Sequence, residues 1–377
     1  MADPSSMPAD FASARDAGFL PLFWELAAVE DARRLAAAKS LEARTFTAQA
    51  ELGPVDAGAD ARLEDVVSAE VLYTIKRLVR GLPSSRDAAR EGFALALTVV
   101  VSAVPAVTLS HLLELSSTAL ALTKQHKGQE ERDLLFGRLF FNLAVIRSGV
   151  LARDSTKADD AVTCLTQLLQ VSDRKSYVRD VGIEAACQLL AAAAVGRDSH
   201  SDIVVALRDA ALAWARTRTD AGALAIQFEV AASLRAKWSR VLPDWVEHDP
   251  LNESNLTRLA DVLRETTTSN PRLHPVWSRL IAIVAERCND QGKGHAVVQA
   301  FWTAVGDSLM TSTLDRRFIA FSVLKELLVA LPASAAPLLT SATTFGTLIR
   351  VLRDQDSILY KVAESAVRLF LFLFVIF

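Results

Sequence analysis

Apolar residues recur at spacings of three and four along most of the chain, the pattern that places them on one face of an α-helix. The first clear case comprises Val67, Val71, Ile75, Leu78 and Leu82. No segment bounded by turn residues alternates apolar and polar positions with the period of two that marks a half-buried strand. The pattern therefore predicts a chain built from helices.

A helix end, a turn and a new helix are expected around residue 83. Gly81 can take the left-handed conformation that closes a helix, and Pro83 cannot continue one. Ser84 and Asp87 form an S-x-x-D pair, in which the hydroxyl accepts from an unpaired first-turn amide. A second helix should begin at about residue 86. Gly92 within it costs about 1 kcal/mol relative to alanine, which close packing against a neighbouring helix would explain.

Further helices follow at short intervals, with a turn expected at residues 172–173. The other expected helices cover residues 109–123, 130–147, 203–216, 221–241, 256–267, 276–288, 295–310, 317–331 and 358–374. Helices of this length joined by short loops pack as antiparallel pairs, of about 40 residues each here. The predicted fold class is all-α, an α-solenoid of antiparallel helix pairs of the HEAT or armadillo kind. A compact, irregular helical fold is the alternative, because no letter-by-letter repeat is visible.

Turn-rich stretches suggest where the chain divides. Residues 47–65 contain Gly53, Pro54 and Gly58, and residues 242–254 contain Pro243 and Pro250. We expect a disordered N-terminus over residues 1–22, N-terminal helical repeats over 23–241, and continuing repeats over 255–377, truncated at the C-terminus.

The two chain ends indicate neither secretion nor a membrane span. The N-terminal residues include Asp and Arg where a signal peptide needs an apolar run. The last nine residues, 369–377, are apolar throughout. A spanning helix needs about 20 such residues. We interpret this segment as the buried end of a helix.

Composition agrees with a helical protein inside the cell. Hydrophobic residues make up 51% of the chain, with only 15 Gly and 12 Pro. The balance of 41 basic against 44 acidic residues gives a net charge of -3. This balance predicts no global attraction to nucleic acid or to an anionic membrane, so any such binding must be local. Cys164, Cys187 and Cys288 lie in apolar helical patterns and are expected to be reduced core residues.

No catalytic, cofactor or metal site is visible, and no small-molecule substrate is expected. A template-directed polymerase needs closely placed carboxylates that hold two metal ions. Asp159 and Asp160 are adjacent, but neighbours on a helix point about 100° apart and cannot share a metal. The six histidines are scattered, without an HExxH pattern. Gly292-Lys293-Gly294 lacks a phosphate-loop frame and is interpreted as a turn, and Ser110-His111 as a helix start.

A group of basic residues around the turn at residues 81–83 is the one candidate binding surface. It comprises Lys76, Arg77, Arg80, Arg86 and Arg90. Such an edge could contact RNA phosphates or a protein partner. The alternative is a solvated helix face on which Asp87 and Glu91 pair with these residues. Aromatic residues that would stack on bases are missing between them.

Several strings resemble the N-terminal helical region of the nucleolar Myb-binding protein family, whose fungal members are named DNA polymerase V or DNA polymerase phi. The strongest are IKRLVRGLPSSRDAAREGFALALT at residues 75–98 and ERDLLFGRLFFNLAVIRSG at 131–149. Residues 23–41, 270–284 and 301–328 are similar to other family segments, in the same order. Family members are longer and continue through acidic stretches to a basic tail, which is why we expect a truncated array here.

The resemblance implies a function, with two alternatives. It implies a non-enzymatic scaffold in the nucleus and nucleolus that acts in ribosomal DNA transcription, ribosome biogenesis and transcription regulation. The implied partners are nucleolar proteins and transcription factors, together with ribosomal DNA or precursor ribosomal RNA. One alternative is a DNA polymerase, as the family name suggests. The other is a karyopherin-like adaptor, which rests on solenoid shape alone.

Overall fold

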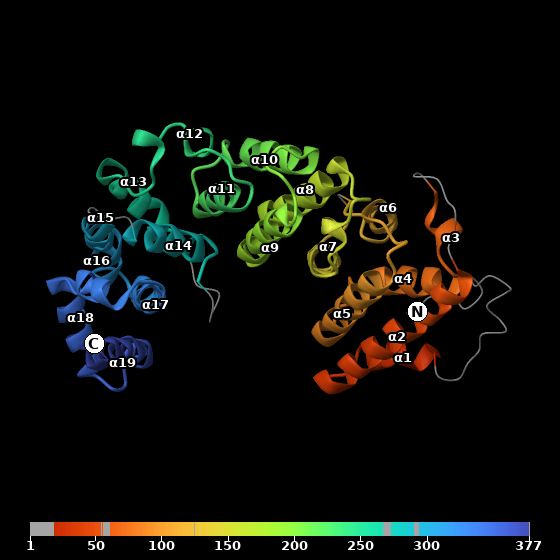
Figure 1. The fold of residues 1–377 in the computed structure, drawn as a ribbon. Helices are drawn as coiled ribbons and strands as arrows, with labels where there is room; N and C mark the ends of the chain where they lie inside the picture. The colour runs from red at the N-terminus through yellow and green to blue at the C-terminus, as the bar shows by residue number, and fades with distance from the viewer. Residues whose placement is uncertain are drawn as a thin grey trace. The chain divides into compact units, whose positions relative to one another are not determined.

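The computed structural model describes residues 19–53, 55, 61–123, 125–266, 273–289 and 294–376. Every regular element among these residues is a helix, which confirms the all-α prediction (Figure 1). The chain forms two compact units, residues 1–207 and residues 208–377. We call them the N-terminal unit and the C-terminal unit. The division falls inside α10 (Asp202–Ala215), away from both turn-rich stretches.

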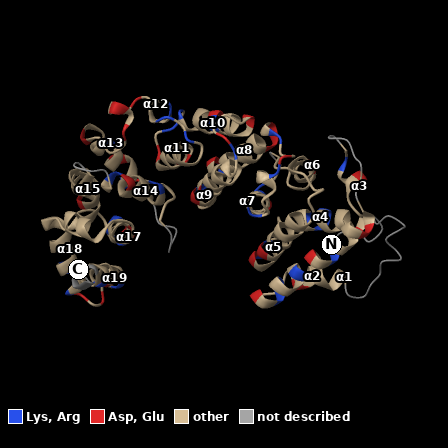
Figure 2. Cartoon of the chain, in the orientation of Figure 1, with Lys and Arg blue, Asp and Glu red and all other residues tan. Residues whose placement is uncertain are grey.

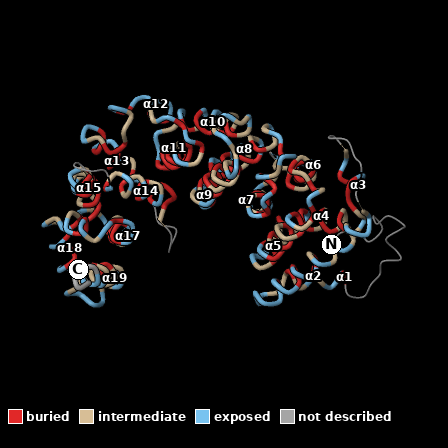
Figure 3. The backbone as a smooth tube through the Cα atoms, viewed as in Figure 1, coloured by how far each residue is buried: buried red, intermediate tan, exposed pale blue. Residues whose placement is uncertain are grey.

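The helices of the N-terminal unit pack in two layers (Figure 1). Helices α4, α6 and α8 contact one another in succession, and so do α5, α7 and α9, while α2 packs on α4 and α5. Their buried residues lie where helices face each other (Figure 3). The bounds are α1 Phe19–Glu25, α2 Asp31–Leu52, α3 Leu63–Val66, α4 Ala69–Gly81, α5 Asp87–Ala103, α6 Leu109–Ala119, α7 Gln129–Arg147, the 3-10 turn Val150–Ala152, α8 Ala158–Arg174 and α9 Ser176–Ala194.

The C-terminal unit repeats this succession with more interruptions. Helices α11, α14, α17 and α19 contact one another in order. In a second set of contacts, α13 packs on α15, and α16 packs on α18. A π-helical segment, Trp302–Gly306, joins α15 to α16. The bounds are α11 Ala221–Ser233, α12 Trp238–Val241, the 3-10 turn Val246–His248, α13 Glu253–Arg264, α14 Val276–Cys288, α15 Gly294–Phe301, α16 Asp307–Met310, α17 Leu314–Ala330, the 3-10 helix Ala333–Leu339, α18 Ala342–Leu352 and α19 Tyr360–Ile376.

Most predicted helices are found within a few residues of their expected ends. The range 276–288 is matched by α14, and 295–310 by the continuous run from α15 to α16. The single helix expected over 221–241 is wrong, because α11 ends at Ser233 and Arg235 has a positive φ of 51°. Helix α18 was not predicted. In the turn-rich stretch 47–65, α2 continues to Leu52 and α3 begins at Leu63.

The two glycines near the α4–α5 turn are both explained by packing. Gly81 stays in α4 without the left-handed conformation expected of it, and a Cβ there would lie 2.6 Å from the Phe93 ring. A Cβ on Gly92 would lie 1.8 Å from the Leu26 carbonyl oxygen, which confirms the close-packing prediction. The cap that Ser84 was expected to form at the start of α5 is absent. Ser84 Oγ accepts instead from the N–H of Arg86, the residue before α5, at 3.2 Å.

The two chain ends depart from expectation. Residues 19–22 belong to α1, and residues 1–18 lie outside the described part of the chain, as do Gly292 and Lys293. Near the C-terminus Phe370 is buried, but Leu371 and Phe372 are exposed. The interpretation of this segment as a buried helix end is therefore wrong at these two positions, because they lie on the outer face of α19.

The three cysteines lie in the core, as expected, and all are reduced. Burial raises the pKa of the Cys164 and Cys288 thiols. Within the described ranges, no single helix is long and apolar enough to cross a membrane. Ala333–Leu339 and Ala342–Leu352, which meet at 84°, have enough length and apolar character only in combination.

Candidate functional site

Arg77, one of the predicted edge residues, belongs to an aromatic cluster that holds α1 in place. Phe19 and Phe23 of α1 meet edge to face at 5.4 Å, and Phe23 meets Tyr73 of α4 at 6.1 Å. The Arg77 guanidinium lies 4.5 Å from the Phe23 ring centre and donates to the Tyr73 hydroxyl at 2.5 Å. Arg44 of α2 stacks in the same way on Phe19 at 4.9 Å. Cation–π stacking of this kind commits Arg77 to the fold.

Arg86 is likewise bonded inside the unit, where it contacts the turn between α1 and α2. It donates to the Ala27 carbonyl at 2.9 Å. Arg34 donates to the Val29 carbonyl of the same turn at 2.7 Å and pairs with Glu91 of α5 at 3.0 Å. The turn is thus fixed from two helices, directly beside the close contact at Gly92.

Arg90 is not part of an exposed edge, contrary to the prediction. Only 3% of its side chain is exposed, and its guanidinium lies 4.7 Å from the Phe136 ring centre. It donates to the Ser84 carbonyl at 2.6 Å and pairs with Asp87 and with Asp133 of α7. Burial lowers the pKa of this guanidinium. Arg90 therefore closes the α4–α5 turn and fastens it to α7.

Arg80 in the last turn of α4 and Arg86 are both exposed, and Lys76 is half-buried. Because Arg86 donates to the Ala27 carbonyl, Lys76 and Arg80 are the accessible edge residues outside the contacts described above. The pairing expected from the alternative interpretation is found at Asp87, whereas Glu91 pairs with Arg34. Basic and acidic residues are interspersed over the helices (Figure 2). A binding role for the edge stays a prediction, which now concerns Lys76 and Arg80.

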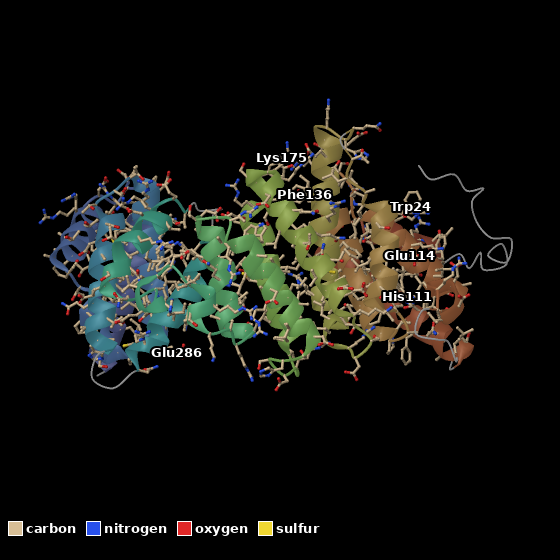
Figure 4. The ribbon with its side chains drawn as sticks, turned by 90° about the horizontal axis from the view of Figure 1, so that it is seen from above. Trp24, His111, Glu114, Phe136, Lys175 and Glu286 are labelled. Atoms are coloured by element: carbon tan, nitrogen blue, oxygen red, sulfur yellow. The ribbon has the colours of Figure 1, made fainter. Side chains whose placement is uncertain are left out.

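A second basic group with aromatic neighbours lies at the corner between α8 and α9. Arg174 and Lys175 pair with Glu131 of α7 at 2.8 and 3.1 Å, and these hydrogen bonds lower the pKa of Glu131. The half-exposed ring of Tyr177 lies 5.9 Å from Phe136, and Figure 4 shows Phe136 and Lys175 at the same end of the unit. The sequence signal for this corner is the adjacent Arg174-Lys175 pair at a helix junction.

The residues considered for catalysis have structural roles. Asp160 accepts a hydrogen bond from Ser110. His111 is buried, its Nδ1 accepts from the Thr108 N–H at 3.2 Å, and its Nε2 lies 2.8 Å from the Ala61 carbonyl oxygen (Figure 4). This pattern caps the start of α6, as the sequence predicted. In the part of the chain that the structure describes, no group of three or more His, Cys, Asp or Glu residues is placed to hold a metal ion.

Comparison with known proteins identifies relatives of the chain. The family model described as DNA polymerase phi matches residues 73–373. The rDNA transcriptional regulator pol5 of Schizosaccharomyces pombe is 27% identical over 305 residues, which cover 78% of this chain and 32% of that protein. The rDNA transcriptional regulator POL5 of Saccharomyces cerevisiae is 24% identical, with 78% and 34% covered. Mouse Myb-binding protein 1A is 28% identical over 173 residues, 46% of this chain and 11% of that protein. The chain spans about a third of the length of the two yeast relatives.

Proposed function

Because the chain belongs to the DNA polymerase phi family, we propose that it is a non-enzymatic helical scaffold that acts in rDNA transcription regulation and ribosome biogenesis. The observation that carries the proposal is the match over 78% of the chain to two yeast proteins named rDNA transcriptional regulators. Neither name is that of a polymerase. A third relative is named for binding Myb, which favours transcription factors among the protein partners.

The packing of helices within each unit supports the scaffold part of the proposal. In the N-terminal unit each helix from α4 to α7 contacts the helix two positions later in the chain. Helices α5, α7 and α9 therefore form one layer, and α4, α6 and α8 form the other. The C-terminal unit has the same order in α11, α14, α17 and α19. Stacked helix pairs of this kind are the repeating unit of an α-solenoid, which we propose as the architecture. Such stacks present extended surfaces to partners.

We propose the nucleus and nucleolus as the place where this scaffold acts, together with nucleolar proteins. The accessible basic pair Lys76 and Arg80 is the proposed contact with ribosomal DNA, precursor ribosomal RNA or an acidic partner segment. Because the net charge is -3, such a contact depends on local charges and should weaken steeply with salt.

A crosslinking pull-down of the tagged chain from cells, with the recovered RNA and protein both sequenced, tests the proposal. We expect enrichment of ribosomal RNA precursors or of factors that transcribe ribosomal DNA. Lys76→Glu with Arg80→Glu should reduce this recovery. Lys39→Glu with Lys127→Glu is the matched control, because it makes the same charge change at two exposed sites of the same unit. Recovery of chaperones alone would refute the scaffold function for this chain. Equal recovery by the two variants would show that Lys76 and Arg80 do not contact the recovered RNA or protein.

A primer-extension assay addresses the polymerase alternative directly. The purified chain is incubated with a primed template, Mg²⁺ and all four deoxynucleotides. We expect no incorporation above that of a heat-denatured sample. Incorporation that follows the protein through a second purification step would overturn the non-enzymatic part of the proposal.

A further inference from the structure

The C-terminal unit contains a cavity of about 330 Å³ between α12, the loop that follows it, and α14. Trp238, Pro250 and Ile283 form its apolar wall. The Trp238 ring packs edge to face on Phe228 at 6.1 Å, so its position is fixed by the core. The volume lies near the lower end of the range found for small-ligand pockets, which is about 300–1,000 Å³.

The polar lining of this cavity is acidic. Glu247, Asp249 and Glu286 contribute carboxylates, whereas Arg287 is the arginine among the lining residues. Arg287 pairs with Asp249 at 2.7 Å, and the neutral Asn252 amide donates to Glu247 at 3.0 Å. Among the described residues, no lysine or arginine pairs with the carboxylate of Glu247 or Glu286, and His248 is the other basic side chain in the lining. Both glutamate side chains are exposed at the mouth, and Figure 4 shows Glu286 at the surface. An aromatic face and two carboxylates form a site for a cation with an apolar stem.

The wall that carries Glu247 is held in an unusual backbone conformation. Glu247 and His248 have positive φ values of 52° and 57°. The buried Asn255 side chain accepts from the Val246 N–H at 3.2 Å and donates to the Val246 carbonyl at 2.9 Å and the Asp249 carbonyl at 2.7 Å. The loop is therefore built before any partner arrives, which lowers the entropy lost on binding.

We propose that this cavity binds a lysine or arginine side chain of a partner protein. The methylene stem packs against Trp238 and Ile283, while the cationic head group lies between the carboxylates of Glu247 and Glu286. This assignment goes beyond the proposed function in two respects. The cavity lies in the C-terminal unit, whereas Lys76 and Arg80 lie in the N-terminal unit. The cavity would bind a basic side chain, whereas Lys76 and Arg80 would attract an acidic partner.

Fluorescence polarisation with short labelled peptides tests the proposal on the full chain. The probes are nine-residue peptides of glycine and serine with two central residues, which are lysine, arginine, norleucine or glutamate. The protein variants are Glu247→Gln with Glu286→Gln in the cavity, and Glu326→Gln with Asp356→Asn as the control at two exposed positions of the same unit. Both double variants remove two negative charges, and Gln and Asn preserve side-chain size.

We expect the lysine or arginine peptide to bind the unmodified chain at about 0.15 M salt, and the cavity variant to bind it about tenfold more weakly. The control variant should bind within about twofold of the unmodified chain. Trp238→Leu should also weaken binding, with circular dichroism showing that each variant is folded.

Several outcomes would overturn the assignment. Equal loss of affinity in the control variant would show attraction to the overall charge, and equal binding of the norleucine peptide would show that no cation is recognised. No binding of either basic peptide at millimolar concentration would exclude the site. Spermidine that binds the cavity as tightly as the peptides would assign it to a free polycation and not to a protein side chain.

Discussion

The two units place their left-handed backbone positions on different kinds of residue. In the N-terminal unit the described residues with positive φ are glycines: Gly53, Gly128, Gly149 and Gly196. In the C-terminal unit the described ones are Arg235, Glu247 and His248. Glycine adopts this conformation without a steric penalty, whereas each of the other three residues costs about 1–3 kcal/mol. The C-terminal unit thus has strained loops where the N-terminal unit has relaxed ones, and two of the three strained residues line the acidic cavity.

The units also differ in how their helices are interrupted. In the N-terminal unit α8 and α9 are separated by Lys175 alone. In the C-terminal unit a π-helical segment divides one helix, and Pro337 lies inside a 3-10 helix. Because loop strain and irregular helices lower local stability, we expect the C-terminal unit to open more readily.

Gly92→Ala should produce the largest effect and act on the N-terminal unit. The new Cβ would lie 1.8 Å from the Leu26 carbonyl oxygen, a backbone atom that cannot rotate away. We expect a loss of about 3 kcal/mol in the free energy of unfolding. Hydrogen exchange with mass spectrometry should show faster exchange in α1, α2 and α5. Gly346→Ala in α18 is the matched control, since nothing lies within 4 Å of its Cβ position. This variant should raise the free energy of unfolding by about 1 kcal/mol.

Asn255→Ala should destabilise the C-terminal unit by about 2 kcal/mol, because it removes three side-chain hydrogen bonds to the 246–249 loop and leaves the Val246 N–H without its partner. Exchange should rise in residues 242–252 and leave α4, α5 and α7 unchanged. Equally faster hydrogen exchange in both units would mean that they unfold together, and would contradict the expected difference in their local stability.

The contrast in left-handed positions can be tested by exchanging residue types. Gly149 has a φ of 75° and open space around its Cβ position, so Gly149→Ala should cost about 1–2 kcal/mol from backbone strain alone. Arg235→Gly should gain up to about 1 kcal/mol, because the strain disappears while the unfolded state becomes more flexible. Thermal melts of both variants give the sign of each change. A loss of stability in Arg235→Gly would show that the arginine side chain offsets its strained backbone.

The smallest effect concerns pH and the corner between α8 and α9. Hydrogen bonds from Arg174 and Lys175 lower the pKa of Glu131 in the folded state. Its stabilising contribution is therefore fully present above the ordinary glutamate pKa and is lost as the pH falls through the lowered value. Glu131→Gln should melt below the unmodified chain at neutral pH, and the difference should shrink under acid conditions. A difference that is constant with pH would mean that packing, and not the ion pairs, sets the effect.

Helix positions and the purpose of Gly92 could be predicted from local patterns. The period of 3.6 residues is a property of short windows, and a costly glycine in a helix implies a close neighbour. Family membership was also accessible, because similar strings follow in the same order along residues 23–328. The burial of Arg90 was not, since its partners Asp133 and Phe136 lie on another helix far along the chain. Neither Glu247 nor His248 is a residue type, such as glycine, that indicates a positive φ. The loop conformation, and with it the cavity that these residues line, therefore could not be predicted from the sequence.

The buried cysteines make the chain its own reporter of opening. A thiol reacts as the thiolate, and burial both raises the pKa of Cys164 and Cys288 and blocks access to reagents. Cys164 and Cys187 lie in the N-terminal unit and Cys288 in the C-terminal unit. The order in which an alkylating reagent modifies them would therefore record which unit unfolds first, with no reporter residue introduced by mutation.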